Sequence, residues 1–339
     1  MIVVTGGTGL VGAHLLLKLL KENNSIRAIV REESSPKKVL AIWKHYVQSP
    51  EGLLDKIDWY RCDITDKASL YDALHDAAQV YHCAAQVNLD GTDKRKMFEV
   101  NVLGTQNIVN ICLAQNVNKL LHVSSIAAIG KSLNGKTLME TDGWPVKSKS
   151  IYTQTKTLAE LEVWRGIAEG LNAVIINPSV IVGPGNWESS SSRFFDVIYK
   201  GLNYYTKGIT GFVDVNDVTD AMVQLMNGEI SGERFILNSE NISIQDFFNK
   251  IAVSLGVTPP SRYASPFKTS LAWKAEFIKS ILTGSTPKIT KQSARTSHTS
   301  RFYSGDKIKN QLNFDYTPMD ESIARTAKFY LQELNRFPI

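Results

Sequence analysis

Two side-chain pairs in the sequence have the residue types and the spacing for proton transfer. Tyr152 and Lys156 stand four residues apart in "IYTQTKTLAE", which has a helical pattern, and Tyr303 and Lys307 have the same spacing in "YSGDK". On a helix, a lysine cation one turn away favours the phenolate and lowers the pKa of a tyrosine from about 10. A phenol tuned in this way can act as a general acid or base. Spacing alone does not separate the two pairs, so their surroundings must decide.

A glycine-rich loop near the first residue has the types and spacing for phosphate binding. The stretch "TGGTGLVG", residues 5–12, directly follows an apolar strand-like run and opens a helical pattern. Glycines allow a tight turn there, and they let backbone N–H groups approach a pyrophosphate at the positive end of the helix. Two registers fit, Gly7-x-Gly9-x-x-Gly12 and Gly6-x-x-Gly9-x-x-Gly12. The place of the loop predicts a dinucleotide site.

The residues after the second strand-like run bear on the choice between NAD and NADP. An acidic side chain at this place would bind the adenosine ribose hydroxyls and favour NAD. The chain has "IVREESSPKK", with Arg31 directly after the run. A guanidinium can hold a 2′-phosphate through charge-assisted bonds, and Lys38 would add a second charge. The alternative is a solvated Arg31 with Glu32 or Glu33 at the ribose. We predict NADP as the cofactor, and otherwise NAD.

Alternating strand-like and helical patterns up to about residue 182 must position these groups. The strand candidates are residues 1–5, 25–30, 57–62, 79–84, 119–125 and 172–178, and the helical patterns between them are residues 12–22, 69–77, 101–115 and 151–170. This order is typical of parallel sheets covered by helices on both faces. We predict an α/β fold, a Rossmann doubly wound parallel sheet of about seven strands with a smaller, mostly helical C-terminal lobe.

The pattern changes after residue 183. A Gly/Ser-rich loop is followed by a strand–turn–helix pattern, and "ERFILN" is the expected last strand of the sheet. Beyond it the pattern is helical, with proline-rich joints. The expected division is an NADP-binding domain of residues 1–182, to which 208–238 return, and a substrate-binding lobe of residues 183–207 and 239–339.

The composition limits the class of protein. The 339 residues are 43% hydrophobic and 21% charged, as in globular chains, and the net charge of +5 is spread along the sequence, unlike a nucleic-acid binder. No apolar run reaches the roughly 20 residues of a membrane span, and no signal peptide precedes the first strand. Neither the three cysteines nor the six histidines have metal-ligand spacing. We expect a cytoplasmic protein with a small-molecule substrate, and without a metal, a nucleic-acid partner or an integral membrane segment.

Seven motifs resemble, in order, those of the extended short-chain dehydrogenase/reductases, within the NAD-dependent epimerase/dehydratase superfamily. They are "TGGTGLVG", "CDITD", "YHCAAQ", "NVLGTQN", "HVSSIAAIG", "YTQTK" and "NPSVIVGPG". The similarity covers nearly the whole chain and is greatest to the dihydroflavonol-4-reductase-like and 3β-hydroxysteroid-dehydrogenase-like branch. It implies hydride transfer between a nicotinamide and a carbonyl carbon, while a proton reaches the carbonyl oxygen.

The resemblance assigns the catalytic roles. Tyr152 would be the general acid/base, and Lys156 would tune its pKa and bind the nicotinamide ribose. Ser125, the second serine of "VSSIAAIG", would position the substrate oxygen. Ser124 is expected to be structural. Asn101 is interpreted as a cap or kink residue and stays outside the catalytic set.

The second pair, Tyr303 and Lys307, is expected to be structural. No strand that ends in serines precedes it, and its helical pattern only begins there. The segment resembles the start of a C-terminal helix in the family, where the lysine is structural.

The resemblance also implies the cofactor contacts. They are Gly6, Gly9, Leu10, Val11 and Gly12 at the pyrophosphate, Asp63 and Ile64 at the adenine, Ala84 and Ala85 after the fourth strand, Tyr152 and Lys156 at the ribose, and Pro178 near the nicotinamide. Arg31 and Lys38 at the 2′-phosphate are expected from the residues after the second strand and not from the resemblance. Related enzymes often have arginine before this proline, where the present chain has Asn177.

Four activities fit this scaffold to different degrees. We predict an NADP-dependent oxidoreductase that reduces a ketone or aldehyde of a small to medium, partly apolar substrate. The alternative is an NAD-dependent nucleotide-sugar epimerase, with Arg295 as a phosphate contact, although Thr210 and Gly211 stand where related epimerases usually have arginine. Dehydratases place carboxylates after the catalytic hydroxyl, where this chain has Ile126 and Ala127. A cofactor-sensing binding module would typically lack the tyrosine and the lysine.

Three further expectations concern the substrate lobe and the surface. Side chains that could line the substrate pocket are Val87, Leu89, Phe194, Phe195, Tyr204 and Tyr205, and the alternative for each is a place in the core. Residues 266–284 form a basic amphipathic helix pattern, with Phe267, Leu271, Ile278, Ile281 and Leu282 near one face, which would cap the substrate lobe or touch a membrane surface. The resemblance also implies a homodimer through the two long helices near Asn101 and Tyr152.

Overall fold

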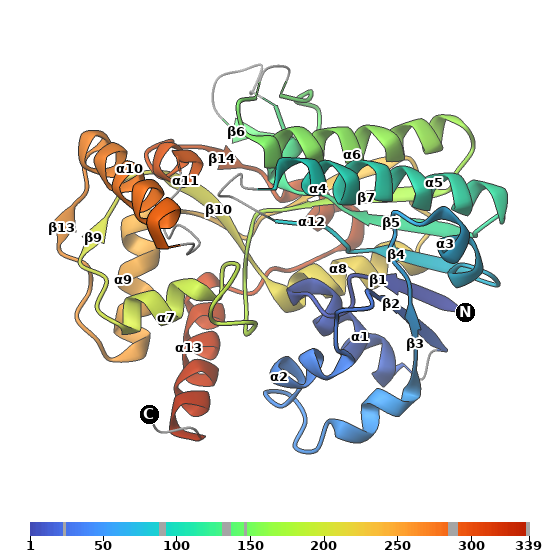
Figure 1. Cartoon of the computed structure of the whole chain (residues 1–339), viewed down its shortest axis with the longest axis horizontal. Helices are drawn as coiled ribbons and strands as arrows, with labels where there is room; N and C mark the ends of the chain where they lie inside the picture. The colour runs from blue at the N-terminus through green and yellow to red at the C-terminus, as the bar shows by residue number, and fades with distance from the viewer. Residues whose placement is uncertain (23–24, 88–92, 131–136, 146–147, 284–290, 337–339) are drawn as a thin grey trace.

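The first sheet contains seven parallel strands, as the sequence predicts. The computed structural model describes residues 1–22, 25–87, 93–130, 137–145, 148–283 and 291–336. Across the sheet the strand order is β3-β2-β1-β4-β5-β7-β11 (Figure 1). The strands are β1 (Ile2–Thr5), β2 (Ile26–Val30), β3 (Ile57–Arg61), β4 (Gln79–His82), β5 (Lys119–Val123), β7 (Ala173–Pro178) and β11 (Glu233–Leu237). The strand order reverses between β1 and β4, and ligands of such sheets bind at this point beyond the carboxyl ends.

Helices cover both faces of this sheet because its strands are apolar on both sides. Val4, Leu121 and Val174 face one layer and Val3, Leu120 and Ile175 face the other, in two separate core clusters. The first layer holds α1 (Leu10–Lys21), η1 (Pro36–Val39), α2 (Leu40–Trp43), η2 (Glu51–Lys56) and α8 (Val215–Asn227). The second holds α3 (Lys67–Ala73), α4 (Lys94–Phe98), η3 (Glu99–Leu103), α5 (Gly104–Ala114) and α6 (Ile151–Ala168), where α5 and α6 run side by side (Figure 1).

A second core lies beside the carboxyl end of the first sheet. It contains a three-stranded sheet of β8 (Val180–Val182), β10 (Ile209–Asp214) and β12 (Glu240–Ser243). Phe212 stacks on Phe247, with ring centroids 4.1 Å apart. The helices around this core are α7 (Arg193–Tyr199), α9 (Ile244–Leu255) and α13 (Met319–Arg336).

Residues 208–238 are shared between the two sheets. Strand β10 belongs to the three-stranded sheet. Strand β11 belongs to the first sheet, and α8 packs against that sheet. The chain therefore crosses several times between the core around the first sheet and the second core around the three-stranded sheet. The remaining elements are η4 (Ile126–Ala128), the paired strands β6 (Thr137–Leu138) and β14 (Phe302–Tyr303), the paired strands β9 (Tyr204–Tyr205) and β13 (Arg262–Tyr263), and the helices α10 (Pro266–Thr283), α11 (Lys291–Thr296) and α12 (Asp306–Leu312).

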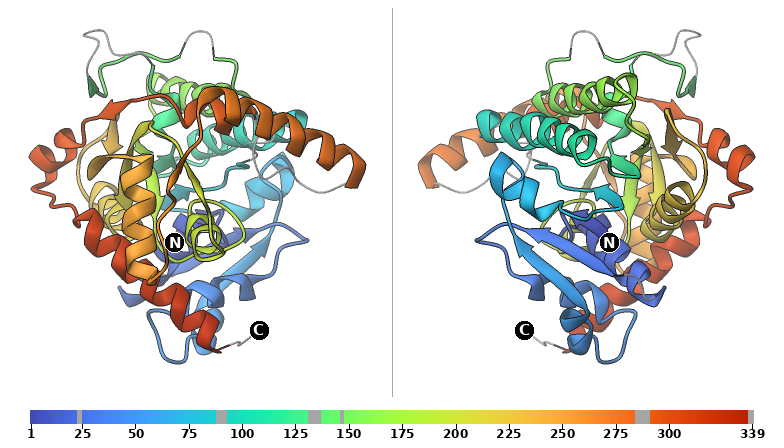
Figure 2. Two further views of the ribbon diagram at one scale, coloured as in Figure 1. Left: turned by 90° about the vertical axis from the view of Figure 1, so that its left-hand side faces the viewer. Right: turned by 90° about the vertical axis from the view of Figure 1, so that its right-hand side faces the viewer.

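Helix α10 corresponds to the amphipathic pattern and projects from the body of the molecule (Figure 2). Phe267 and Leu271 are exposed on it. The side chains of Ile278, Ile281 and Leu282, and residue 284, lie outside the described part of the chain. Within the described residues, no helix combines the length and the apolarity that a membrane crossing requires.

Candidate functional site

The glycine loop joins β1 to α1 in a conformation that only glycines fit. Gly6 has a φ of +70°, and a Cβ on it would lie 2.6 Å from the backbone nitrogen of Ala84. A Cβ on Gly12 would overlap the carbonyl oxygen of Gly6. Gly9 is the N-cap of α1 and provides no side-chain cap, and Leu10 and Val11 follow in the first turn. The first N–H groups of a helix lack partners within it, so this cradle fits an anion such as a pyrophosphate.

The end of β4 lies directly against this loop. The backbone N–H of Ala84 donates to Thr5 Oγ1 (3.2 Å), and that of Cys83 donates to the Thr5 carbonyl (3.2 Å). Ala84 is half-buried and Ala85 is exposed. The structure thus brings the predicted pyrophosphate residues and the two alanines together at the reversal of strand order.

The residues predicted for the 2′-phosphate lie at the surface beyond β2. Arg31 is exposed, and its guanidinium lies 3.1 Å from the carboxylate of Glu33. Lys38 is exposed in η1. Sequence reasoning missed Arg61, which ends β3 opposite Val30 and donates to the Glu32 carbonyl (2.6 Å). Arg61 stands near the end of the third strand-like run, and a basic residue at that place is the signal that could have found it.

The residues predicted for the adenine follow β3. Asp63 is exposed, and its carboxylate accepts hydrogen bonds from the N–H (2.9 Å) and the hydroxyl (2.7 Å) of Thr65, which closes a turn. Ile64 is buried, and Gly104 leaves room for it, because a Cβ there would lie 2.6 Å from Ile64 Cδ1. Ile64 can therefore line a site only through its backbone.

The three predicted catalytic residues meet beyond the carboxyl ends of β5 and β7. Tyr152 lies in the first turn of α6, which Ser150 caps by accepting from the Thr153 N–H (3.1 Å). The Ser125 side chain lies close enough to the Tyr152 phenol to lower its pKa. Lys156 follows one turn later, is buried, and donates from Nζ to the Val123 carbonyl (2.8 Å).

Burial dominates the electrostatics of this group. It raises the pKa of Tyr152, which the Ser125 side chain only partly opposes. The net shift of this pKa is therefore upward, opposite to the lowering expected from Lys156, whose ammonium also donates to the Val123 carbonyl. Burial lowers the pKa of Lys156 itself to about 8, against the opposing charge of Glu160.

Asn101 and Asn177 link the elements of the site. Asn101 accepts from the Gln86 N–H (2.6 Å) and donates to Thr155 Oγ1 (3.1 Å), so it ties the loop after β4 to α6. It lies in the π-helical segment η3, as a kink residue would. Asn177, which is fully buried, donates to the Ser125 carbonyl (3.0 Å). Pro178 follows it, buried at the end of β7.

The two residues of the second tyrosine–lysine pair do not lie on one face of a helix. Tyr303 is buried in β14, and Lys307 lies in α12. Lys307 Nζ donates to the Arg234 carbonyl (2.9 Å) and forms an ion pair with Glu233 (2.7 Å). These contacts are structural, in line with the interpretation from the sequence.

The expected substrate-pocket side chains do not gather at one place. Phe195 is fully buried and Phe194 packs on Phe247 and Phe248, so both belong to the second core. Val87 and Tyr204 are exposed, Tyr205 is half-buried at that core, and Leu89 lies outside the described residues. Arg295 is exposed on α11. The expectation for Phe195 was wrong, because it fills the core under α9, whereas Phe194 is half-buried against that core.

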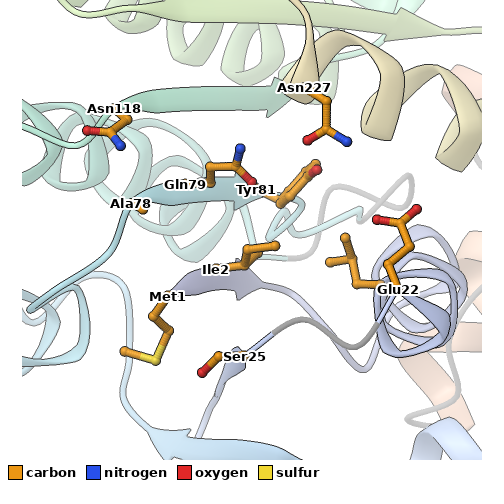
Figure 3. A pocket seen from close by; sticks show the side chains of 10 residues that line it. Met1, Ile2, Glu22, Ser25, Ala78, Gln79, Tyr81, Asn118 and Asn227 are labelled. Carbon is orange, nitrogen blue, oxygen red and sulfur yellow. The ribbon is translucent and has the colours of Figure 1, made fainter.

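A cavity of about 330 Å³ lies at the amino ends of strands of the first sheet, away from their carboxyl ends (Figure 3). It is lined by Ile2, Gln79, Asn118 and Ser25, residues at or before the amino ends of strands, and by Asn227 at the end of α8. The predicted catalytic residues lie beyond the carboxyl ends, so this cavity is separate from them. Among the described residues, no group of three or more His, Cys, Asp or Glu side chains is arranged to hold a metal ion.

A doubly wound sheet with this glycine cradle and a serine, a tyrosine and a lysine at its carboxyl edge defines a dinucleotide-dependent enzyme class. The family model of the NAD dependent epimerase/dehydratase family matches residues 2–237, and the chain belongs to this family. It is an NAD(P)-dependent short-chain dehydrogenase/reductase of the extended type.

Similar proteins include reductases. The chain is 28% identical over 338 residues to the "Putative dihydroflavonol 4-reductase" of Synechocystis sp., which covers 96% of this chain and 93% of that protein. It is 24% identical over 350 residues to cinnamoyl-CoA reductase 1 of Petunia hybrida, which covers 100% and 94%. Among solved structures, gox2253 superposes with a TM-score of 0.80 at 26% identity, over 98% of both chains. UDP-glucose 4-epimerase of Thermus thermophilus shares the fold, with a TM-score of 0.74 at 20% identity over 100% and 99%.

Proposed function

We propose that this protein is an NADP-dependent reductase of a ketone or aldehyde carried by a small to medium, partly apolar molecule. The observation that carries the proposal is that Ser125, Tyr152 and Lys156 meet beyond the carboxyl ends of β5 and β7, at the same end of the sheet as the glycine cradle. The reductases among the similar proteins favour this activity over epimerisation.

The side chains of the site suit proton delivery to a carbonyl oxygen. A reduced nicotinamide, when bound, supplies the hydride for the carbonyl carbon. Ser125 donates a hydrogen bond to the oxygen, and Tyr152 gives it the phenolic proton. The Lys156 ammonium stabilises the phenolate that is left, because an opposite charge nearby favours the charged form. A proton from solvent then restores the phenol.

The preference for NADP rests on the charge beyond β2 and β3. Arg31 and Arg61 lie on neighbouring strand ends, with Lys38 farther along the same loop. A planar guanidinium binds a phosphate through two parallel bonds. The Glu33 partner of Arg31 is exposed, so solvent screens that ion pair and a phosphate can replace it.

Side-by-side titration of protein stripped of nucleotide with NADPH and NADH tests the cofactor. We expect NADPH to bind about 10-fold or more tightly, since a charged hydrogen bond contributes about 1.5–3 kcal/mol. Equal or tighter binding of NADH contradicts the NADP assignment. Nucleotide that copurifies as NAD and resists stripping favours an epimerase, and nucleotide sugars then become the substrates to test.

We also propose a homodimer through α5 and α6. Leu158 and Leu161 on α6, and Leu103 directly before α5, are exposed, and an interface would bury them. Light scattering coupled to size exclusion should give twice the mass of one chain. The double variant Leu158→Glu/Leu161→Glu should give the mass of one chain, and a wild-type monomer contradicts this proposal.

A further inference from the structure

A buried carboxylate lies one helical turn after Lys156. Glu160 is fully buried on α6. Five polar side chains point to it. The donors are Ser124 Oγ (2.6 Å) and Asn177 Nδ2 (2.6 Å) at Oε2, and Arg234 Nη1 (2.7 Å), Trp144 Nε1 (3.1 Å) and Trp164 Nε1 (3.5 Å) at Oε1. The carboxylate therefore joins α6 to the ends of β5 and β7 and to β11.

Arg234 forms an ion pair with this carboxylate (2.7 Å) and is itself held in place. Only 6% of its side chain is exposed, and it also donates to the carbonyls of Glu140 (2.7 Å) and Asp142. Its guanidinium lies 5.3 Å from the ring centroid of Trp144. A buried ion pair contributes little net stability compared with apolar packing, so stability alone does not account for the pair of Glu160 and Arg234. The pair is better explained by the fixed geometry that it gives to the groups around it.

The network reaches the substrate-binding serine through two neighbours. Asn177 donates from one Nδ2 atom to Glu160 Oε2 and to the Ser125 carbonyl (3.0 Å). Ser124, bonded to the same carboxylate oxygen, precedes Ser125 in the chain. The backbone of Ser125 is thereby tied to the helix that carries Tyr152 and Lys156.

We propose that Glu160 is a positioning residue of the active site, which fixes Ser125 relative to Tyr152 and Lys156 through Ser124 and Asn177. The proposal rests on the reductase function proposed above. The carboxylate does not touch the reacting atoms. It acts by holding the hydrogen-bond donor, the acid and the cation in one arrangement.

The charge of Glu160 also acts on Lys156. The titratable groups that face Lys156 are Cys83, His82 and His122 from the strands and Glu160 from its own helix. Burial keeps the pKa values of both histidines low and raises that of Cys83, so these groups are neutral at pH 7. Glu160 is then the main charge that keeps the ammonium protonated.

The variant Glu160→Gln tests the proposal because it keeps the shape and removes the charge. We expect kcat to fall about 10-fold or more, while NADPH affinity stays within about threefold of wild type. The alkaline limb of the pH profile of kcat should move to lower pH, because the pKa of Lys156 falls without the carboxylate. Asp217→Asn is the matched control. Asp217 is buried on α8 and bonded to Thr317, so it should lower Tm without moving the limb.

Each outcome of this experiment either supports or contradicts the positioning role of Glu160. A folded Glu160→Gln protein with wild-type kcat and an unmoved alkaline limb overturns the proposal. If that variant does not fold, Asn177→Ala takes its place and should lower kcat about 10-fold at unchanged cofactor affinity; unchanged kcat overturns the proposal equally. The series includes wild type and Tyr152→Phe. A wild type that reduces no carbonyl contradicts the reductase function, whereas an active wild type with an unaffected Glu160→Gln contradicts only the role of Glu160.

Discussion

The proposed catalytic end and the proposed adenine end of the site lie beyond the carboxyl ends of the strands of one sheet but are built differently. At the catalytic end, Ser125, Tyr152 and Lys156 are buried or half-buried, and Lys156 is bonded to the backbone. At the adenine end, Arg31 and Asp63 are exposed, and their partners lie within two residues in the sequence. Proton transfer requires fixed distances, whereas recognition of a phosphate tolerates mobile side chains in water. We therefore expect substitutions at the catalytic end to have the larger effects.

The largest expected effect is that of Tyr152→Phe. Loss of the phenolic proton should lower kcat for carbonyl reduction by about 10²–10⁴-fold, the usual contribution of a general acid. The matched control is Tyr303→Phe, which changes the tyrosine of the other Tyr-x-x-x-Lys segment and should leave kcat within about twofold. Circular dichroism and Tm establish that both variants fold. Equal kcat values for the two variants would remove the distinction between the pairs.

At the adenine end, Arg31→Ala should weaken NADPH binding about 10- to 100-fold and leave NADH binding unchanged. The reason is the loss of charge-assisted bonds to the 2′-phosphate, each worth about 1.5–3 kcal/mol. Titration of the variant with both cofactors measures the difference. Arg95→Ala, which changes an exposed arginine on α4, is the control. A loss of similar size for both cofactors would contradict a role specific to the phosphate.

The pH dependence of the reaction should reveal the buried lysine. The rate of reduction should fall as the pH rises through about 8, where Lys156 loses its proton. Below that pH the ammonium is present and stabilises the phenolate, so the rate should be maintained. In Lys156→Met this limb should be missing and the rate low throughout. A wild-type profile that stays flat to pH 10 would contradict the lowered pKa.

The smallest expected effect belongs to Asp63→Ala. Its carboxylate is exposed and accepts two hydrogen bonds from Thr65, so the free energy of unfolding should fall by about 1 kcal/mol or less. Urea unfolding of the variant measures this change. A loss of several kcal/mol would mean that the adenine end is as tightly built as the catalytic end.

Some of these features could be predicted from the sequence because local signals specify them. Apolar runs separated by helical patterns gave the seven strands, and Gly6 and Gly12 marked a turn that the backbone geometry requires. Tyr152 and Ser125 followed from motifs whose order is that of a known family. The spacing of apolar residues, and glycines at a turn that requires them, can both be recognised in a single sequence.

Other features depend on contacts between distant residues, which no local pattern contains. The sequence around Glu160 is that of an ordinary helix, and its ion pair with Arg234, 74 residues away, forms only in the folded chain. Phe195 resembled a pocket residue because its type suits a pocket and a core equally, and burial decided for the core. The pKa of Tyr152 was predicted to fall from spacing alone, whereas burial raises it. Desolvation is a property of the folded chain.

Transfer of deuterium from labelled NADPH to a carbonyl carbon is the most direct test of the reductase function. Wild type, Tyr152→Phe and Tyr303→Phe would each be incubated with deuterium-labelled NADPH and a panel of ketones and aldehydes, and the products analysed by mass spectrometry. We predict an alcohol with one deuterium on the former carbonyl carbon from wild type and Tyr303→Phe, and almost none from Tyr152→Phe. Unlabelled, unreduced carbonyls throughout, or equal labelling by Tyr152→Phe, would contradict the function and the acid proposed here.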